Sequence, residues 1–466
     1  MQSLSERKEM KWFALLVVMA GVFLSTLDSG MVNIAIPTLM RYYRLPIEEA
    51  EQIVTIYLLT ITITLVFWGR IADRKGLENI YLGGLLVFSM GAWLSFFSGG
   101  FSFLLFSRFI QGLGASMMMA SGPALIKISF PVKNLGRNLG IVGIATACGL
   151  LTGPLVCGYL LNHFLWKSIF LLLGLVSLIV SLLGFLLFRS QLHHRTNLQP
   201  ESFDWGGSFC WVAIVALGLN ILQSVNQTGF IAFGIKLTVL ILILVVFVHV
   251  ERSTVHPILP LSLIGNRYYW VGVTTAGFSF LSLFSVLVLI PFYLDYVLHF
   301  SSKQIGLAMM AVPGTLVLLS PTAGFLYDKI GAKYLTSFGL LVSCLALAGL
   351  SGLSADSSVW WILSLLAAMG AGQSIFLSPN SASVLSKVGD GCIGATAGIL
   401  ATARNFGMVV GATLATVLFS YFSVNGLMLL SKSDVDTAQF VIAFGATLKC
   451  IAALSLSACL ISLLRD

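Results

Sequence analysis

Long apolar runs separated by short polar segments dominate this chain of 466 residues. Each run is roughly 20 mostly apolar residues or longer, the length that a helix needs to cross the hydrocarbon core of a bilayer. Fourteen runs are present, which predicts fourteen membrane-spanning helices. They cover residues 12–37, 50–68, 80–98, 101–126, 138–161, 168–189, 205–222, 230–250, 269–294, 304–326, 335–353, 358–378, 394–423 and 440–463.

Two longer polar stretches, Ser190–Asp204 and Glu251–Arg267, divide the runs into groups of six, two and six. The sequence therefore predicts an all-α polytopic membrane protein, with two six-helix bundles and two inserted helices. The expected parts are an N-terminal cytoplasmic segment 1–11, a first bundle 12–189, a linker 190–267 with the inserted helices, and a second bundle 268–466.

The distribution of charged residues adds one point to this picture, namely the orientation of the chain in the membrane. Charged residues are 9% of the chain, against roughly 25% in a soluble domain, so lipid must cover most of the surface. The net charge of +8 does not indicate nucleic-acid binding, because the basic residues lie in short loops between apolar runs. Placing both termini in the cytoplasm gives 17 Lys and Arg inside and five outside. That bias favours a multi-pass protein of the inner or plasma membrane with cytoplasmic termini.

The sequence offers little material for metal or enzyme chemistry. Its seven cysteines form no Cys-x-x-Cys pair and no Cys/His cluster, so we expect no disulfide framework and no metal site. The six histidines lie mainly in loops or at the ends of runs, and no nucleophile–base pair is evident. A membrane-embedded enzyme or sensor is therefore the weakest functional alternative, and no cofactor is expected.

One loop pattern, G-x-x-x-D-x-x-G, occurs twice. GRIADRKG follows the second run and GFLYDKIG follows the tenth, 255 residues later. Duplication at equivalent positions argues against a generic basic turn and for two related halves, as in one class of secondary transporter. The motif residues are Gly69, Asp73, Arg74, Gly76, Gly324, Asp328 and Gly331.

Asp28 and four basic residues, Arg108, Lys236, Arg404 and Lys449, lie within the apolar runs. Asp28 alone of the eighteen acids sits well inside a run, and Arg108 lies within the fourth run. Charges at this depth are costly unless they face protein or water. A carboxylate that exchanges a proton for a cation suits proton-coupled export, and a nearby arginine would tune it. The alternatives are a hydrogen-bonded structural Asp28 and an Arg108 bonded to backbone carbonyls.

The fifth run has one face of small residues at four-residue spacing, with a proline that adds a kink. Such a face permits very close helix packing in lipid, which is also the physical basis of any gating role. Its motif residues are Gly149, Gly153, Pro154 and Gly158, and the thirteenth run carries a similar spacing at Gly407 and Gly411.

Other polar residues within or near the runs are candidates for lining a substrate cavity. They are Asn33, Gln111, Gln373, Arg404, Asn405, Lys449 and Asp295.

Four segments resemble motifs of the major facilitator superfamily, and in particular its fourteen-helix drug:proton antiporter branch. GRIADRKG is similar to motif A, RFIQGLGAS to motif B, GLLTGPLVCG to motif C, and LDSGMVNIAIP to the span-one motif of that branch. The resemblance covers nearly the whole chain. It departs from the family pattern at Leu77 and Glu78 after motif A, at Cys157 in motif C, and at Lys167, where arginine is usual.

The resemblance implies alternating access by rocking of two bundles, and export driven by a proton gradient. Asp28 would be the proton or cation site, with Arg108 beside it, and motif A would stabilise one conformation. The expected substrates are amphipathic, often cationic small molecules, and the expected unit is a monomer in the lipid bilayer. The alternative is a dedicated exporter of a siderophore, lipid or metabolite, whose anionic group would meet Arg108, Arg404 and Lys449.

Overall fold

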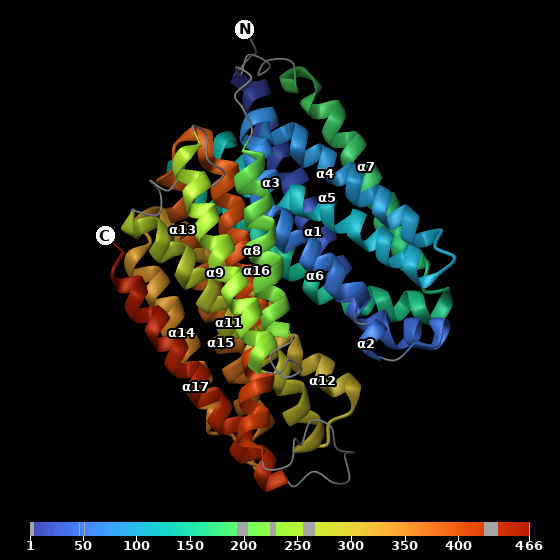
Figure 1. Cartoon of the computed structure of the whole chain (residues 1–466), viewed down its shortest axis with the longest axis vertical. Helices are drawn as coiled ribbons and strands as arrows, with labels where there is room; N and C mark the ends of the chain where they lie inside the picture. The colour runs from blue at the N-terminus through green and yellow to red at the C-terminus, as the bar shows by residue number, and fades with distance from the viewer. Residues whose placement is uncertain are drawn as a thin grey trace. The chain divides into compact units, whose positions relative to one another are not determined.

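The computed structural model describes residues 4–45, 47–50, 52–192, 204–223, 230–254, 266–423 and 437–465. Within these ranges the regular structure is entirely helical (Figure 1). The long helices are α1 (Leu4–Tyr43), α3 (Gln52–Lys75), α4 (Leu77–Phe96), α5 (Phe101–Ser129), α6 (Leu135–His163), α7 (Ser168–Leu192), α8 (Trp205–Gln223), α9 (Phe230–Ser253), α11 (Arg267–Tyr296), α13 (Ala311–Ile330), α14 (Lys333–Ser351), α15 (Val359–Ser386), α16 (Ile393–Phe422) and α17 (Thr437–Leu463). The short ones are α2 (Ile47–Ala50) and α12 (Ser302–Met309), with the 3₁₀ turns η1 (Val132–Asn134) and η2 (Asp390–Cys392).

The predicted fold class is confirmed, because each of the fourteen apolar runs corresponds to a long helix. Thirteen helices in the described ranges are long and apolar enough to cross a membrane. The fourteenth, α8, has a shorter apolar stretch, Trp205–Ile221. Residues 193–203 and 255–265 of the predicted polar stretches lie outside the described residues, as do residues 1–3 of the N-terminal segment. The limits of the predicted bundles stay a prediction.

Two helices differ from the predicted runs. Helix α1 begins at Leu4 instead of residue 12, because the polar segment before Trp12 is rich in Glu, Lys and Met, which favour helix. The tenth run is divided into α12 and α13 at Met310. Pro313 lies in the first turn of α13, where a missing backbone N–H costs little, and it disfavours one continuous helix.

The described helices divide into two compact units. Unit 1 comprises Met1–Ala216, Val246–Leu261 and Leu385–Thr402, and unit 2 comprises Leu217–Val245, Ser262–Val384 and Ala403–Asp466. In unit 1, α5 packs along α4 and α3, while α1 packs along α6 (Figure 1). Glycine permits the closest approach, since a Cβ added to Gly114 of α5 would lie 2.6 Å from the carbonyl oxygen of Gly84 on α4.

Unit 2 has an aromatic core between α11, α16 and α17. The Tyr293 ring stacks on Phe444 at a centroid distance of 5.0 Å, and Phe419 lies 5.0 Å from Phe440. These four side chains are fully buried. Aromatic pairs in this geometry add about 0.5–1.5 kcal/mol each beyond the area they bury.

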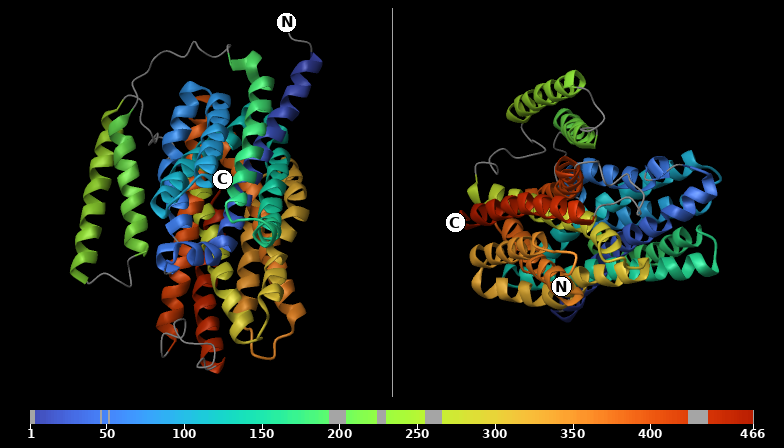
Figure 2. Two further views of the ribbon diagram at one scale, coloured as in Figure 1. Left: turned by 90° about the vertical axis from the view of Figure 1, so that its right-hand side faces the viewer. Right: turned by 90° about the horizontal axis from the view of Figure 1, so that it is seen from below.

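Helices α8 and α9 lie side by side (Figure 2). Trp211 contacts Phe247 at 6.0 Å between ring centroids, and the Lys236 ammonium donates to the Asn220 side chain over 2.8 Å. Only 6% of the apolar window of α9 is buried by protein. A helix that is apolar all round and yet uncovered needs a non-aqueous surrounding.

Candidate functional site

The two deep charges of unit 1 form a buried ion pair between α1 and α5. One guanidinium nitrogen of Arg108, Nη1, donates to both carboxylate oxygens of Asp28, over 2.8 and 3.0 Å. The same nitrogen donates to the Gln111 side-chain oxygen at 2.6 Å, and the Gln111 amide donates to Asp28 at 3.2 Å. All three side chains are fully buried. The spacing of Arg108 and Gln111, three residues apart on one helix, places both beside the same carboxylate.

Arg108 also contacts α3. Its Nε donates to the Ile53 carbonyl oxygen at 3.2 Å, and its guanidinium carbon lies 4.3 Å from the centre of the Tyr57 ring. Arg108 therefore bonds both to a carboxylate and to a backbone carbonyl, which combines the two roles considered for it. A buried pair of this kind is neutral as a whole, and losing either charge leaves the other uncompensated.

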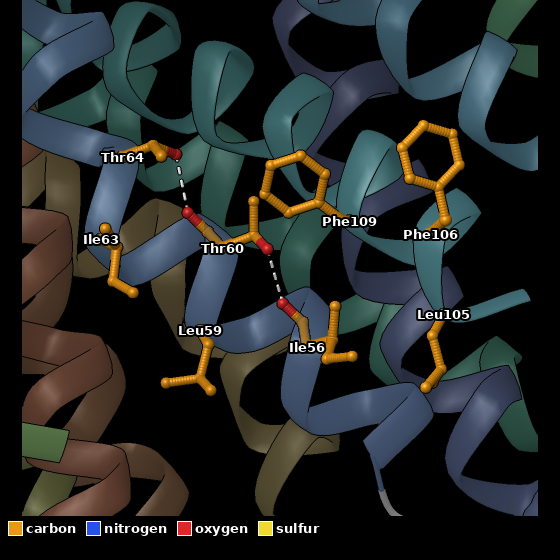
Figure 3. A pocket seen from close by; sticks show the side chains of 8 residues that line it. All are labelled: Ile56, Leu59, Thr60, Ile63, Thr64, Leu105, Phe106 and Phe109. Carbon is orange, nitrogen blue, oxygen red and sulfur yellow. Dashed lines mark hydrogen bonds between the residues drawn. The ribbon is translucent and has the colours of Figure 1, made fainter. Parts of the chain in front are cut away.

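An apolar cavity of about 420 Å³ is lined by side chains of α3 and α5 (Figure 3). The Thr60 hydroxyl donates to the Ile56 carbonyl oxygen, and the Thr64 hydroxyl donates to the Thr60 carbonyl oxygen, each over 2.7 Å. Because both hydroxyls are bonded to their own helix, the threonines offer few free donors to the cavity. The lining residues are Ile56, Leu59, Thr60, Ile63, Thr64, Leu105, Phe106 and Phe109.

The first motif A loop ties α3 to the beginning of α16 within unit 1. The two Asp73 carboxylate oxygens accept from the backbone N–H groups of Gly394 and Ala395, over 2.6 and 2.9 Å. An anion at a helix N-terminus satisfies free N–H groups and complements the helix dipole. Gly69 allows this approach, since a Cβ there would lie 2.3 Å from the Gly394 carbonyl oxygen. Arg74, the basic residue after Asp73, lies in the last turn of α3.

The second glycines of the two motif copies both have positive φ. Gly76, between α3 and α4, has φ +95°, and Gly331, between α13 and α14, has φ +79°. These are the only glycines with positive φ in the described part of the chain. Such values favour glycine, so the repeat has a backbone basis in both copies. Gly324 is buried on α13, and Asp328 is partly buried near the end of that helix.

The small face of α6 packs against α1. A Cβ on Gly149 would lie 2.0 Å from the Thr26 hydroxyl oxygen, and one on Gly153 would lie 3.0 Å from the Gly30 Cα. Pro154 lies inside α6 next to this contact. Gly158 differs, because a Cβ there would meet nothing within 4 Å.

The remaining cavity candidates do not share one environment. Gln373 and Asn405 are buried in unit 2, where Gln373 accepts from the Ser279 hydroxyl at 2.6 Å. Arg404 is partly buried and donates to the Ser381 hydroxyl. Asn33 and Lys449 are exposed, and Asp295 lies partly buried in the last turn of α11.

Three buried contacts had no signal in the sequence pattern. Tyr57 under Arg108 is one aromatic residue among many, and Lys127 of α5 donates to the Val388 carbonyl oxygen after α15. Arg465, just after α17, is fully buried and donates to Asn380, Ser383 and Thr275. Burial lowers the pKa of Arg465 to about 10, so the guanidinium remains charged at neutral pH. Only the position of each neighbouring helix reveals these partners.

Comparison with known proteins gives relatives along nearly the whole chain. The riboflavin transporter RibZ of Clostridioides difficile is 32% identical over 433 residues, covering 93% of this chain and 92% of that protein. The multidrug resistance protein Stp of Mycobacterium tuberculosis is 26% identical, covering 90% and 78%. The tetracenomycin C resistance and export protein of Streptomyces glaucescens is 25% identical, covering 88% and 76%.

Solved structures share the fold. The proton:xylose symporter XylE superposes with a TM-score of 0.63 at 15% identity, covering 97% of this chain and 96% of that one. The human organic anion transporter MFSD10 gives 0.64 at 14% identity, covering 97% and 99%. The sequence profile of the Major Facilitator Superfamily matches residues 18–412, and again residues 272–462. The chain therefore belongs to the major facilitator superfamily of membrane transporters.

Proposed function

We propose that this protein exports amphipathic small molecules, organic cations among them, in exchange for protons. The observation that carries the proposal is the buried cluster of Asp28, Arg108 and Gln111. A proton on Asp28 would cancel its charge and leave the Arg108 guanidinium uncompensated in a dry environment. Proton binding would therefore favour a different arrangement of α1 and α5, which is what coupling to alternating access requires.

The cavity between α3 and α5 supports an amphipathic substrate. Its wall is aliphatic and aromatic, with Phe106 and Phe109 on α5 (Figure 3). Such a surface binds flat or apolar groups through apolar contact area and requires few hydrogen bonds. Export agrees with the similarity to the multidrug resistance protein Stp and to the tetracenomycin C resistance and export protein.

We further assign the chain to the fourteen-helix drug:proton antiporter branch, as a monomer in the cell membrane with cytoplasmic termini. The four motif segments and the fourteen long helices support this assignment. Reporter fusions at each terminus test the orientation, because a reporter active only outside the cytoplasm should be silent at both ends.

Proteoliposomes loaded with a fluorescent organic cation test the coupling. A pH step of one unit contributes about 1.4 kcal/mol per proton, and the membrane potential contributes about 2.3 kcal/mol per net charge per 100 mV. If one proton exchanges for one monocation, no net charge moves. Dissipating the pH gradient should then stop transport, while collapsing the potential should change it little. Transport that needs only the potential would contradict the proposal.

Asp28→Asn in the same vesicles separates coupling from binding. The amide keeps the shape of the side chain but cannot exchange a proton, so transport driven by the pH gradient should be lost. Substrate-for-substrate exchange across the membrane should continue, because it needs no proton. The matched control is Asp356→Asn in the exposed loop before α15. Gradient-driven transport at the native rate in Asp28→Asn would refute the role of Asp28.

A second candidate is a dedicated transporter of one ring-shaped metabolite, such as riboflavin. The observation that favours it is that Arg108 already neutralises Asp28, so a substrate cation finds no free carboxylate there. The similarity to RibZ agrees with this candidate. Competition distinguishes the two, because a dedicated carrier should ignore unrelated organic cations that a multidrug exporter would accept.

A further inference from the structure

Two aromatic rings contact the guanidinium of the buried ion pair. The Arg108 Cζ lies 4.3 Å from the centre of the Tyr57 ring of α3 and 5.8 Å from the centre of the Phe170 ring of α7. Both rings are fully buried. An aromatic face attracts a cation within about 6 Å of its centre, and more strongly where water is excluded. Arg108 therefore has electron-rich partners on two helices besides the Asp28 carboxylate of α1.

The Tyr57 ring is held in place by contacts with two other helices. Its hydroxyl lies 3.2 Å from the Ser25 hydroxyl of α1. Its backbone approaches α5, since a Cβ added to Gly112 would lie 3.0 Å from the Tyr57 carbonyl oxygen. The ring is therefore a fixed surface, and the longer Arg108 side chain is the partner that can adjust to it.

A proton on Asp28 changes which partners Arg108 has. The guanidinium stays charged, because arginine does not lose its proton in proteins. Its remaining contacts are the neutral oxygens of Ile53 and Gln111, at 3.2 and 2.6 Å, and the two ring faces. The rings therefore offset part of the cost of leaving a buried guanidinium without a carboxylate.

We propose that Tyr57 is a positioning residue for proton coupling, whose ring holds the Arg108 guanidinium when Asp28 is protonated. This inference rests on the proposed role of Asp28 as the proton site. A guanidinium released by the carboxylate settles closer to the ring, so the ring stabilises the protonated state more than the charged one. Without the ring, Asp28 should bind its proton only at lower pH. Phe170 lies farther from the guanidinium and should act in the same direction, but more weakly.

The other titratable groups near Asp28 keep their charge state around neutral pH. Those that contact α1 are Tyr57 of α3, Tyr81 of α4 and Cys157 of α6. Phenols and thiols ionise at about pH 10 and 8.5 in water. Helix α7 also packs on α1, and its one charged residue, Arg189, lies close to its C-terminal end. A shift caused by a change at position 57 is therefore attributed to Asp28.

The pH profile of transport by the full-length protein in proteoliposomes tests the inference. The probe is the fluorescent monocation N-methylacridinium. The pH is varied on both sides of the membrane at a constant difference of about one unit, so the driving force stays fixed. At high pH the rate falls because Asp28 fails to acquire a proton, and the pH of half-maximal rate is the readout. Tyr57→Leu should lower this pH by roughly one unit, while Tyr57→Phe keeps the ring and should stay near the native value.

Fluorination separates the charge distribution of the ring from its shape. Trifluorophenylalanine introduced at position 57 should lower the half-maximal pH relative to Tyr57→Phe, because fluorine withdraws electron density from the face that attracts the cation. Phe170→Leu should lower it by less than Tyr57→Leu. The control is Phe88→Leu, which removes a fully buried ring of α4 that does not contact Arg108 in the described part of the chain. It should leave the half-maximal pH unchanged even if it lowers the unfolding temperature.

A fluorinated protein whose half-maximal pH equals or exceeds that of Tyr57→Phe would overturn the inference, whether or not Tyr57→Leu folds. An equal shift in Phe88→Leu, or a Tyr57→Phe that behaves like Tyr57→Leu, would also overturn it. Asp28→Asn, measured alongside, distinguishes this from failure of the proposed function. Native-rate transport in Asp28→Asn, or no gradient-driven transport by the native protein, removes the proposed function and this inference together. Loss of transport in Asp28→Asn with unchanged profiles at position 57 counts against Tyr57 alone.

Discussion

At the residue scale, the fully buried Asp28–Arg108 pair determines what a single substitution can do. The carboxylate receives donors from Arg108 and Gln111, and the guanidinium also reaches Ile53 on a third helix. A buried pair of this type adds little net stability compared with apolar residues of equal volume, yet breaking it leaves an uncompensated charge. The pair is therefore better suited to holding one arrangement of α1, α3 and α5 than to strengthening the fold.

Arg108→Met should lower the free energy of unfolding by about 3–5 kcal/mol, because it leaves the Asp28 carboxylate buried and unpaired. The double variant Asp28→Asn with Arg108→Met should regain most of that loss, since neither charge remains. Thermal unfolding in one detergent compares Asp28→Asn, Arg108→Met and the double variant with the native protein. Additive losses in the double variant would show that the two side chains do not act as a pair.

The same scale shows how far sequence alone reaches. The closeness of Asp28 and Arg108 can be predicted, because charges within apolar runs must face protein or water and the family resemblance implies that Arg108 lies beside Asp28. The hydrogen-bond partners of Gln373 and Arg404 cannot be predicted in this way. Ser279 and Ser381 are two serines among many, and only the relative positions of the packed helices bring them close. The helices themselves are predictable because an apolar run of fixed length has few alternatives in lipid.

At the element scale, the contact between α1 and α6 depends on glycine at specific turns. Gly149 has no room for a Cβ beside Thr26, while Gly158, nine residues further along the same helix, faces open space. The break between α12 and α13 was not predicted, because hydropathy is insensitive to backbone geometry and only Pro313 indicates it.

Gly149→Ala should destabilise the protein and slow transport, because the new methyl group must displace the Thr26 side chain and the backbone behind it. Overpacking of this kind costs about 1–3 kcal/mol. Gly158→Ala is the matched control and should be neutral or slightly stabilising, since alanine favours helix over glycine by about 1 kcal/mol. Unfolding temperature and initial transport rate serve as measurements. Equal effects of the two substitutions would show that the small face does not limit packing.

At the scale of the whole molecule, unit 1 contains a segment from late in the chain. The first turns of α16 belong to it, held through the bonds from Gly394 and Ala395 to Asp73 and the bond from Arg70 to the Gly391 carbonyl oxygen at 3.0 Å. Because this contact joins residues more than 300 positions apart, it is a natural place for a transport cycle to make and break a link.

Asp73→Asn should loosen this link, since an anion at a helix N-terminus is worth about 0.3–2 kcal/mol. The accessibility of Cys392 measures the contact between α3 and α16, because its sulfur lies 3.9 Å from the Arg70 guanidinium and the residue is partly buried. With the other six cysteines replaced by alanine, the labelling rate of Cys392 should rise roughly two- to thirtyfold in Asp73→Asn. Asp356→Asn is the control and should not change it. An unchanged rate in Asp73→Asn would show that the carboxylate does not hold α16.

The Thr60 and Thr64 hydroxyls donate to carbonyl oxygens of their own helix, and this affects which ligands the cavity can bind. The cavity wall that contains these two threonines is almost entirely apolar. A ligand there gains affinity through apolar contact area and finds few hydrogen-bond partners for a polar substituent. A compound that gains a hydroxyl on the part seated there would lose water without receiving a replacement bond. Among close analogues of a ligand bound in this cavity, an added polar group at that end should therefore lower affinity more than a change of size or ring type.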